Sequence, residues 1–180
     1  MRLFPTRRCS AAIVALLVAA LPLRLRAQGQ WTTALGLMVG PTVPLSTYAD
    51  DKNVGYLAGL TISIRTPLSA VGFRIDGNFS ELRYKGSSTK DQIWMASANA
   101  VLKMPSALAV SPYLIGGGGI YNWRRAPSLG NNSSTAFGFN GGVGLRFGIG
   151  ESYTFVEARY HMANGRNDIR MIPITFGVSF

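Results

Sequence analysis

Cysteine, histidine and charged residues are all scarce in this sequence of 180 residues. One cysteine (Cys9) and one histidine (His161) are present, which excludes a disulfide within the chain and a metal site built from several histidines. Charged residues make up only 14% of the chain, against roughly 25% in soluble domains. After residue 27 there is no run of about 18 apolar residues, so a membrane-spanning helix is excluded from that part.

The N-terminus has the pattern of a secretory signal peptide. MRLFPTRR is basic, AAIVALLVAALPL is a short apolar core, and Ala27 ends a suitable cleavage site. We therefore divide the chain into a signal peptide, residues 1–27, and one domain, residues 28–180. An uncleaved membrane anchor is the alternative, and the shortness of the apolar core disfavours it.

Removal of residues 1–27 changes the charge. The whole chain has 18 basic and 8 acidic residues and a formal charge of +10. The leader holds five of the basic residues and none of the acidic ones, so 13 basic and 8 acidic residues remain, a charge of +5. The basic character belongs largely to the leader, and it does not indicate a nucleic-acid partner.

Apolar residues alternate with small or polar ones through the rest of the chain. The last ten residues, MIPITFGVSF, place five large apolar side chains on one face. Seven earlier segments have the same period of two: WTTALGLMVG, VGYLAGLTISIR, AVGFRIDGNFS, IWMASANAVLKM, SPYLIGGGGIYNW, FGFNGGVGLRFG and YTFVEARYHM. The pattern predicts eight strands and no helix.

The connections between these strands alternate in length. Long polar loops follow the odd strands, at residues 43–53, 84–92, 124–135 and 162–170, and tight turns follow the even ones. Prolines fall in connections or near strand ends, and we place Pro173 at the outer rim of the last strand. The sequence therefore predicts an all-β fold, an eight-stranded antiparallel up-and-down barrel.

The polarity of the strand faces indicates how this barrel is turned. A soluble barrel needs a well-charged outer face, and here most strands offer only one or two charged residues. A transmembrane β-barrel turns its apolar face to lipid and packs small and polar residues inside. Aromatic residues near strand ends suit the interfacial girdles of such a barrel: Tyr56, Trp94, Tyr113, Trp123, Phe147, Tyr153 and Phe180.

The segments PYLIGGGGIY, GFNGGVGLRFG, FVEARYH and ITFGVSF carry a resemblance. Through them the chain resembles the eight-stranded outer-membrane β-barrel family that includes the opacity proteins and the OmpA and OmpX transmembrane barrels. The resemblance implies an outer-membrane location, with membrane lipid and lipopolysaccharide as surroundings. It also implies that the barrel-assembly machinery reads a C-terminal signal at Phe176, Val178 and Phe180.

Strand parity assigns a set of polar side chains to the barrel interior. They are Arg65, Arg74, Asp76, Asn78, Asn99, Lys103, Asn140, Arg146, Glu157 and Arg159. Parity also places Arg124 inside, which brings the inward cations to six against two carboxylates, Asp76 and Glu157. We interpret these carboxylates as partners in buried ion pairs rather than as a catalytic pair. Arg65, Lys103 and Arg146 lie near the tight-turn end and predict a basic periplasmic mouth.

Two motifs raise the question of catalysis. The glycines at 116–119 lack the lysine and helix of a phosphate loop, and we interpret them as making room for large interior side chains. RYHMANGRND is similar to the His-x-Ser-Asn segment of barrel lipid A deacylases, but Ala163 replaces the nucleophilic serine. His161 is then expected at the rim, facing loops or headgroups. We predict no catalytic residue, cofactor or metal.

The favoured function is a structural or surface-interaction barrel, an anchor that displays four extracellular loops to a surface ligand. A narrow anion-preferring pore or small-solute transporter is the alternative, and a lipid A-modifying enzyme is a more remote one. The sequence leaves the ligand and the roles of the loops open.

The signal peptide leads to a first prediction. The purified membrane form should begin at Gln28, because cleavage follows Ala27. Intact mass spectrometry of protein from the outer-membrane fraction measures this directly. A mass that retains residues 1–27, or recovery from the soluble periplasm, would contradict it.

Overall fold

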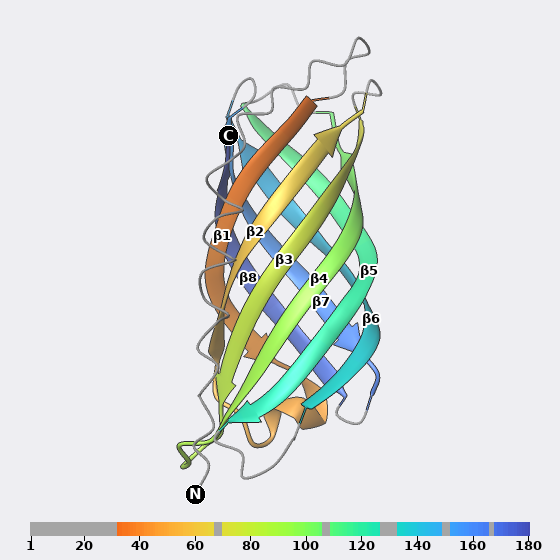
Figure 1. Ribbon diagram of the computed structural model, residues 1–180. Helices are drawn as coiled ribbons and strands as arrows, with labels where there is room; N and C mark the ends of the chain where they lie inside the picture. Colours follow the sequence, from red (N-terminus) through yellow and green to blue (C-terminus); the bar gives the residue numbers. More distant parts are fainter. Residues whose placement is uncertain (1–31, 67–69, 106–108, 127–132, 149–151, 166–167) are drawn as a thin grey trace, which may run out of the picture.

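Eight antiparallel strands close into a barrel in the computed structural model (Figure 1). The structure describes residues 32–66, 70–105, 109–126, 133–148, 152–165 and 168–180. The strands are β1 (Thr32–Pro44), β2 (Gly55–Arg65), β3 (Val71–Arg83), β4 (Lys90–Lys103), β5 (Val110–Ala126), β6 (Ser133–Phe147), β7 (Tyr153–Ala163) and β8 (Ile169–Ser179), and a short 3-10 turn, η1 (Ser46–Ala49), follows β1. Each strand pairs with its neighbours in sequence and β8 pairs with β1, so the predicted up-and-down barrel is confirmed.

The last residue of the chain helps to close the wall. Phe180 donates its backbone N–H to the Leu35 carbonyl oxygen at 2.8 Å, and its own carbonyl accepts from the Leu35 N–H at 3.0 Å. Closure matters because the bilayer core offers no water to unpaired backbone groups. Within the described residues, no helix is long and apolar enough to span a membrane.

The two faces of the wall differ sharply in polarity. The outer face exposes large apolar side chains on every strand, among them Leu37, Leu60, Ile75, Trp94, Ile120, Phe139, Val156 and Phe176. The inner face carries most of the buried polar and charged residues of the described chain. This is the arrangement of a barrel whose outer face contacts lipid.

Glycines on the inner face make room for large side chains of the adjacent strand. Gly144 is paired with Tyr113, and a Cβ at Gly144 would overlap the Tyr113 ring. Gly177 stands in the same relation to Phe155 on β7. A narrow eight-stranded interior can therefore hold whole aromatic rings.

Several predicted positions are corrected by the structure. Tyr113, Trp123 and Tyr153 were expected in the interfacial girdles, but their side chains lie on the inner faces of β5 and β7. Tyr113 and Trp123 are buried there, and Tyr153 lines an inward cavity. Arg124 points outward and Arg125 inward, because the odd residues of β5 are those that face the interior.

The strand ends also differ from the prediction. β5 ends at Ala126 and β6 begins at Ser133, so both strands enter the predicted loop at 124–135. Pro173 is not at a frayed rim, because pairing with β1 and β7 continues on both sides of it. Its inward position, where the ladder skips a few pairs, accommodates the missing N–H.

A closed wall leads to the second prediction. The barrel should resist detergent until it is heated, because it has no free strand edge from which unfolding can begin. Boiled and unboiled samples should therefore migrate differently on a denaturing gel. Identical mobility would count against closure.

Candidate functional site

Four charged side chains meet in the middle of the barrel. Arg74 and Asp76 lie two residues apart on β3, and Glu157 and Arg159 lie two residues apart on β7, so each pair faces inward from one wall. All four are at most 4% exposed. The sequence placed these four residues in the interior, and the structure brings them into direct contact.

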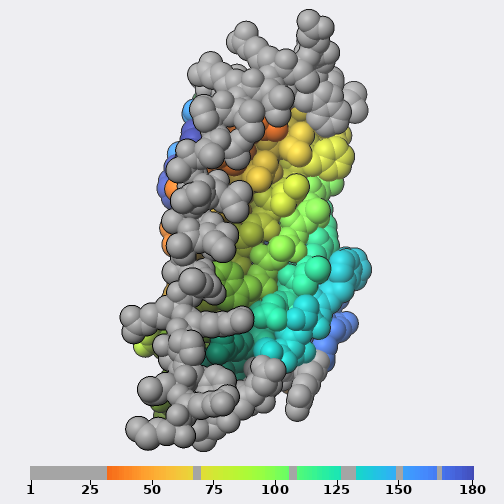
Figure 2. Space-filling model, in the orientation of Figure 1, coloured from red at the N-terminus to blue at the C-terminus, as the bar shows by residue number. Residues whose placement is uncertain are grey.

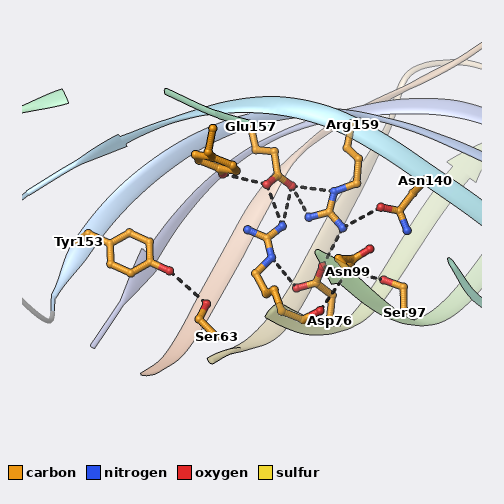
Figure 3. A network of polar contacts seen from close by, with 10 residues as sticks. Ser63, Asp76, Ser97, Asn99, Asn140, Tyr153, Glu157 and Arg159 are labelled. Carbon is orange, nitrogen blue, oxygen red and sulfur yellow. Dashed lines mark hydrogen bonds and ion pairs between the residues drawn. The ribbon is translucent and has the colours of Figure 1, made fainter. Parts of the chain in front are cut away.

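The four groups alternate in sign around a closed ring (Figure 3). The Arg74 guanidinium donates to both Glu157 oxygens at 2.8 Å, and its Nε lies 3.0 Å from Asp76 Oδ1. Arg159 donates from Nη1 to Asp76 Oδ2 at 2.7 Å and from Nε to Glu157 Oε1 at 2.8 Å. Each carboxylate therefore has two guanidinium partners, and the ring as a whole is neutral.

Neutral polar side chains complete the ring. Asn99 on β4 donates to Asp76 Oδ2 at 2.9 Å, and Tyr113 on β5 donates to Glu157 Oε2 at 2.8 Å. Asn140 on β6 accepts from Arg159 at 3.4 Å, and Asn78 lies buried on the inner face of β3. Contacts from β3, β4, β5, β6 and β7 thus converge on one set of charges, which fixes these strands relative to one another.

His161 lies inside the barrel, not at the rim as predicted. It is 2% exposed, and its Nδ1 lies 2.9 Å from the Tyr121 hydroxyl on β5. The error arose because the segment after His161 is polar, whereas the residue itself has the inward parity of β7. No cluster of three metal-ligating side chains occurs among the described residues.

An apolar layer fills the barrel between the charged ring and the end that carries η1, the lower end in Figure 1. It is formed by fully buried inward residues from β2, β3, β4 and β8: Leu57, Leu82, Ile93 and Met171. Tyr48 of η1 is also buried and belongs to the same apolar cluster. Charge and apolar packing therefore occupy successive levels of the interior.

Asp91 organises a second polar cluster at the η1 end, which the sequence did not reveal. Its carboxylate lies 3.4 Å from both Lys52 Nζ and Arg125 Nε, and it accepts from the hydroxyls of Tyr48 at 3.4 Å and Tyr84 at 3.2 Å. Asp91 has the inward parity of β4, which was the one available signal. Its partners come from the first two loops and from β5.

Burial and the neighbouring Asp91 carboxylate raise the pKa of Tyr84 to about 12. The same causes raise the pKa of Tyr48. Both phenols therefore remain protonated donors at neutral pH. The cluster ties the first loop to the β3–β4 hairpin, and Lys85 reinforces it by donating from Nζ to the carbonyl oxygen of Asp50 at 2.9 Å.

The opposite end of the barrel is basic. Arg65, Lys103 and Arg146 line one small cavity of about 40 Å³, together with Tyr153. The Arg146 guanidinium lies 3.8 Å from the centre of the Tyr153 ring, whose hydroxyl is 3.1 Å from Ser63 Oγ. These three predicted interior cations are thus brought together, apart from the charged ring.

The net positive charge of the inward side chains is smaller on the described strands than the sequence predicted. Arg125 takes the place of Arg124, and Asp91 adds a third carboxylate. The described strands then carry six inward cations against three inward carboxylates, a net charge of +3. Pairing within the ring and at Asp91 leaves the excess concentrated at the basic mouth.

The two buried carboxylates of the ring are fully engaged by arginines. Glu157 and Asp76 are each held by two arginines, as buried carboxylates need to be. Ala163, at the position of a nucleophilic serine, is buried and 1% exposed. The site can cross-link walls and obstruct the interior.

Comparison with known proteins supports the architecture. Residues 10–180 match the family described as outer membrane protein beta-barrel domain. No curated protein matches the chain. Among solved structures, Neisserial surface protein A is similar, with a TM-score of 0.66 and 18% identity over 83% of this chain and 97% of the other.

Two Pseudomonas aeruginosa structures are also similar. The N-terminal β-barrel domain of OprF has a TM-score of 0.54 and 14% identity, over 84% of this chain and 100% of the other. Outer membrane protein OprG has a TM-score of 0.51 and 15% identity, over 85% and 98%. At these identities the likeness shows the fold alone.

The charged ring leads to the third prediction. Glu157→Gln should lower the free energy of unfolding by about 3–5 kcal/mol, because two buried guanidinium groups are left with one carboxylate. Urea unfolding in lipid vesicles measures the change. The double variant Glu157→Gln with Arg159→Met should recover part of the lost free energy of unfolding, because one charge of each sign is then absent from the ring.

Asp51→Asn provides the matched control, since it removes an exposed carboxylate from the first loop. Its unfolding midpoint should equal that of the wild type. An equal, small effect of Asp51→Asn and Glu157→Gln would show that the ring does not hold the walls together.

Proposed function

Because this chain belongs to the outer membrane protein beta-barrel domain family, we propose that it is a non-catalytic outer-membrane anchor with an obstructed interior, whose loops meet partners at the cell surface. One observation carries the proposal. Within the described residues, the charged ring and the apolar layer fill successive levels of the interior with buried side chains.

The η1 end supports a surface-interaction role. The first loop is held against the β3–β4 hairpin by Asp91 and its partners, so these two loops form one joined surface. A hollow of about 420 Å³ opens between these loops and is lined by Asp51, Tyr84, Lys85 and Arg125. Its mixed charges and hydroxyls suit a polar surface ligand, with lipopolysaccharide as the surrounding medium.

The C-terminus supports recognition by the barrel-assembly machinery. Phe176, Val178 and Phe180 lie on the outer face, and Phe180 is 63% exposed. An exposed terminal aromatic at the end of β8, the strand that closes the barrel against β1, suits a signal read before insertion. We also propose that the signal peptide is cleaved after Ala27.

The basic mouth favours one alternative, a narrow anion-preferring pore. Arg65, Lys103 and Arg146 would attract anions into the periplasmic end. Passage would still have to cross the charged ring and the apolar layer. We therefore rank an anchor above a pore, and a lipid A-modifying enzyme below both, because Ala163 supplies no nucleophile.

The obstructed interior leads to the fourth prediction. In planar-bilayer recordings, the purified protein should show no steps or only small, anion-preferring ones, because eight strands enclose only enough space for side chains. If small steps occur, Arg146→Gln should weaken their anion preference, and Lys85→Gln in the second loop should not. Large, cation-selective steps would contradict the proposal.

A further inference from the structure

A groove crosses the outer face of the barrel over β2, β3, β4 and β5, whose outer sides lie together on the face shown in Figure 2. Its volume is about 810 Å³. Small outward residues, Ala58, Gly77 and Ala96, line its middle, between larger ones such as Leu60 and Trp94. The space at Gly77 is open, because an added Cβ would meet no atom within 4 Å.

The strand register relates this groove to a row of charges. Phe79 on β3 pairs with Trp94 on β4, and Trp94 pairs with Asn122 on β5, and these residues form the row of the groove nearest the η1 end. Two residues further toward the η1 end, the outward row is Glu81, Gln92 and Arg124. Arg83 and Lys90 form the next outward pair beyond it. Each step of two residues covers roughly 7 Å, so the charges stand directly beyond the end of the groove.

These outward charges are predominantly positive. Three cations, Arg83, Lys90 and Arg124, share this part of the outer face with one carboxylate, Glu81, which is 5% exposed. Lys90 Nζ lies 2.7 Å from Glu81 Oε2 and Arg83 Nε lies 3.7 Å from Oε1. Glu81 thus holds two cations in place and leaves a net charge of +2 at the outer rim.

We propose that this face binds one phosphorylated, acylated lipid of the outer leaflet, of the lipid A class. An acyl chain lies in the groove and a phosphate contacts Arg83, Lys90 and Arg124. Two features of the face select this ligand: an apolar groove in contact with hydrocarbon, and cations where the headgroups begin. The outer leaflet follows from the position of the charges at the η1 end, where the long loops are.

The proposal rests on the outer-membrane placement of the barrel and is independent of whether the interior conducts. It concerns the outer wall, whereas the charged ring and the apolar layer lie inside. Large, cation-selective conductance steps would therefore overturn the proposed anchor function and leave the lipid site standing.

The test is native mass spectrometry of the full protein in detergent. The protein is titrated with bis-phosphorylated lipid A, with the same lipid dephosphorylated, and with inorganic phosphate. The wild type should retain one phosphorylated lipid. The triple variant Arg83→Gln, Lys90→Gln and Arg124→Gln should bind it about tenfold to a hundredfold more weakly, at about twofold to fivefold per cation.

The groove is tested separately by Gly77→Leu, whose Cβ would meet no atom within 4 Å and whose longer side chain would extend into the groove. This variant should also lose the lipid. Its matched control is Gly141→Leu on the outer face of β6, where an added Cβ meets only one backbone oxygen, at 3.9 Å. Arg170→Gln on the outer face of β8 is the control for charge. Both controls should bind like the wild type.

Heat-dependent gel mobility shows which variants fold. Equal retention by the wild type and the triple variant would overturn the proposal, and so would equal retention by Gly77→Leu and Gly141→Leu. Retention of the dephosphorylated lipid at wild-type strength would reduce the site to acyl contact and overturn it as well. Binding of inorganic phosphate as tight as that of lipid A would show that the groove contributes nothing. If the triple variant does not fold, Gly77→Leu against Gly141→Leu decides.

Discussion

Closure of the wall by the last strand is the constraint on which the rest of this barrel depends. In hydrocarbon an open edge would leave a row of unpaired backbone groups, each costing several kcal/mol. The hydrogen bonds between Phe180 and Leu35 lie at the seam where this cost is avoided. Closing with eight strands also fixes the width of the interior, which then has room for side chains and little else. The dense packing of side chains inside the barrel therefore follows from the number of strands.

A narrow interior explains how glycine is used along the inner face. Large inward side chains need space at the facing position of the next strand, and glycine provides it at Gly144 for Tyr113 and at Gly177 for Phe155. Gly142 meets a different constraint, because a Cβ there would overlap the Ala158 carbonyl oxygen on the backbone of β7. Glycine therefore determines where aromatic rings fit inside the barrel and where neighbouring backbones can approach closely.

The sequence was sufficient for the fold because strand alternation is a local property. A charged residue rarely faces lipid within the span, so parity also located the ring residues Arg74, Asp76, Glu157 and Arg159. It failed on β5, where interior aromatics opposite glycine have the same pattern as lipid-facing ones. The Asp91 cluster was beyond reach because Lys52 comes from a loop with no period. Contacts between distant strands, and between a loop and a strand, leave no trace in a local pattern.

The charged ring is costly as a source of stability, because well-packed apolar residues often stabilise a fold at least as well as a buried ion pair. Its value here lies in specifying register. A slip of one residue along β3 would turn Arg74 and Asp76 into lipid and bring Ile75 inside, and a charge in hydrocarbon costs about 2–4 kcal/mol even with relaxation. The same slip on β7 would expose Glu157 and Arg159. Charged residues at the centre of β3 and β7 therefore penalise every slip by an odd number of residues. A barrel with an apolar interior would not penalise such slips, because its two faces would be alike.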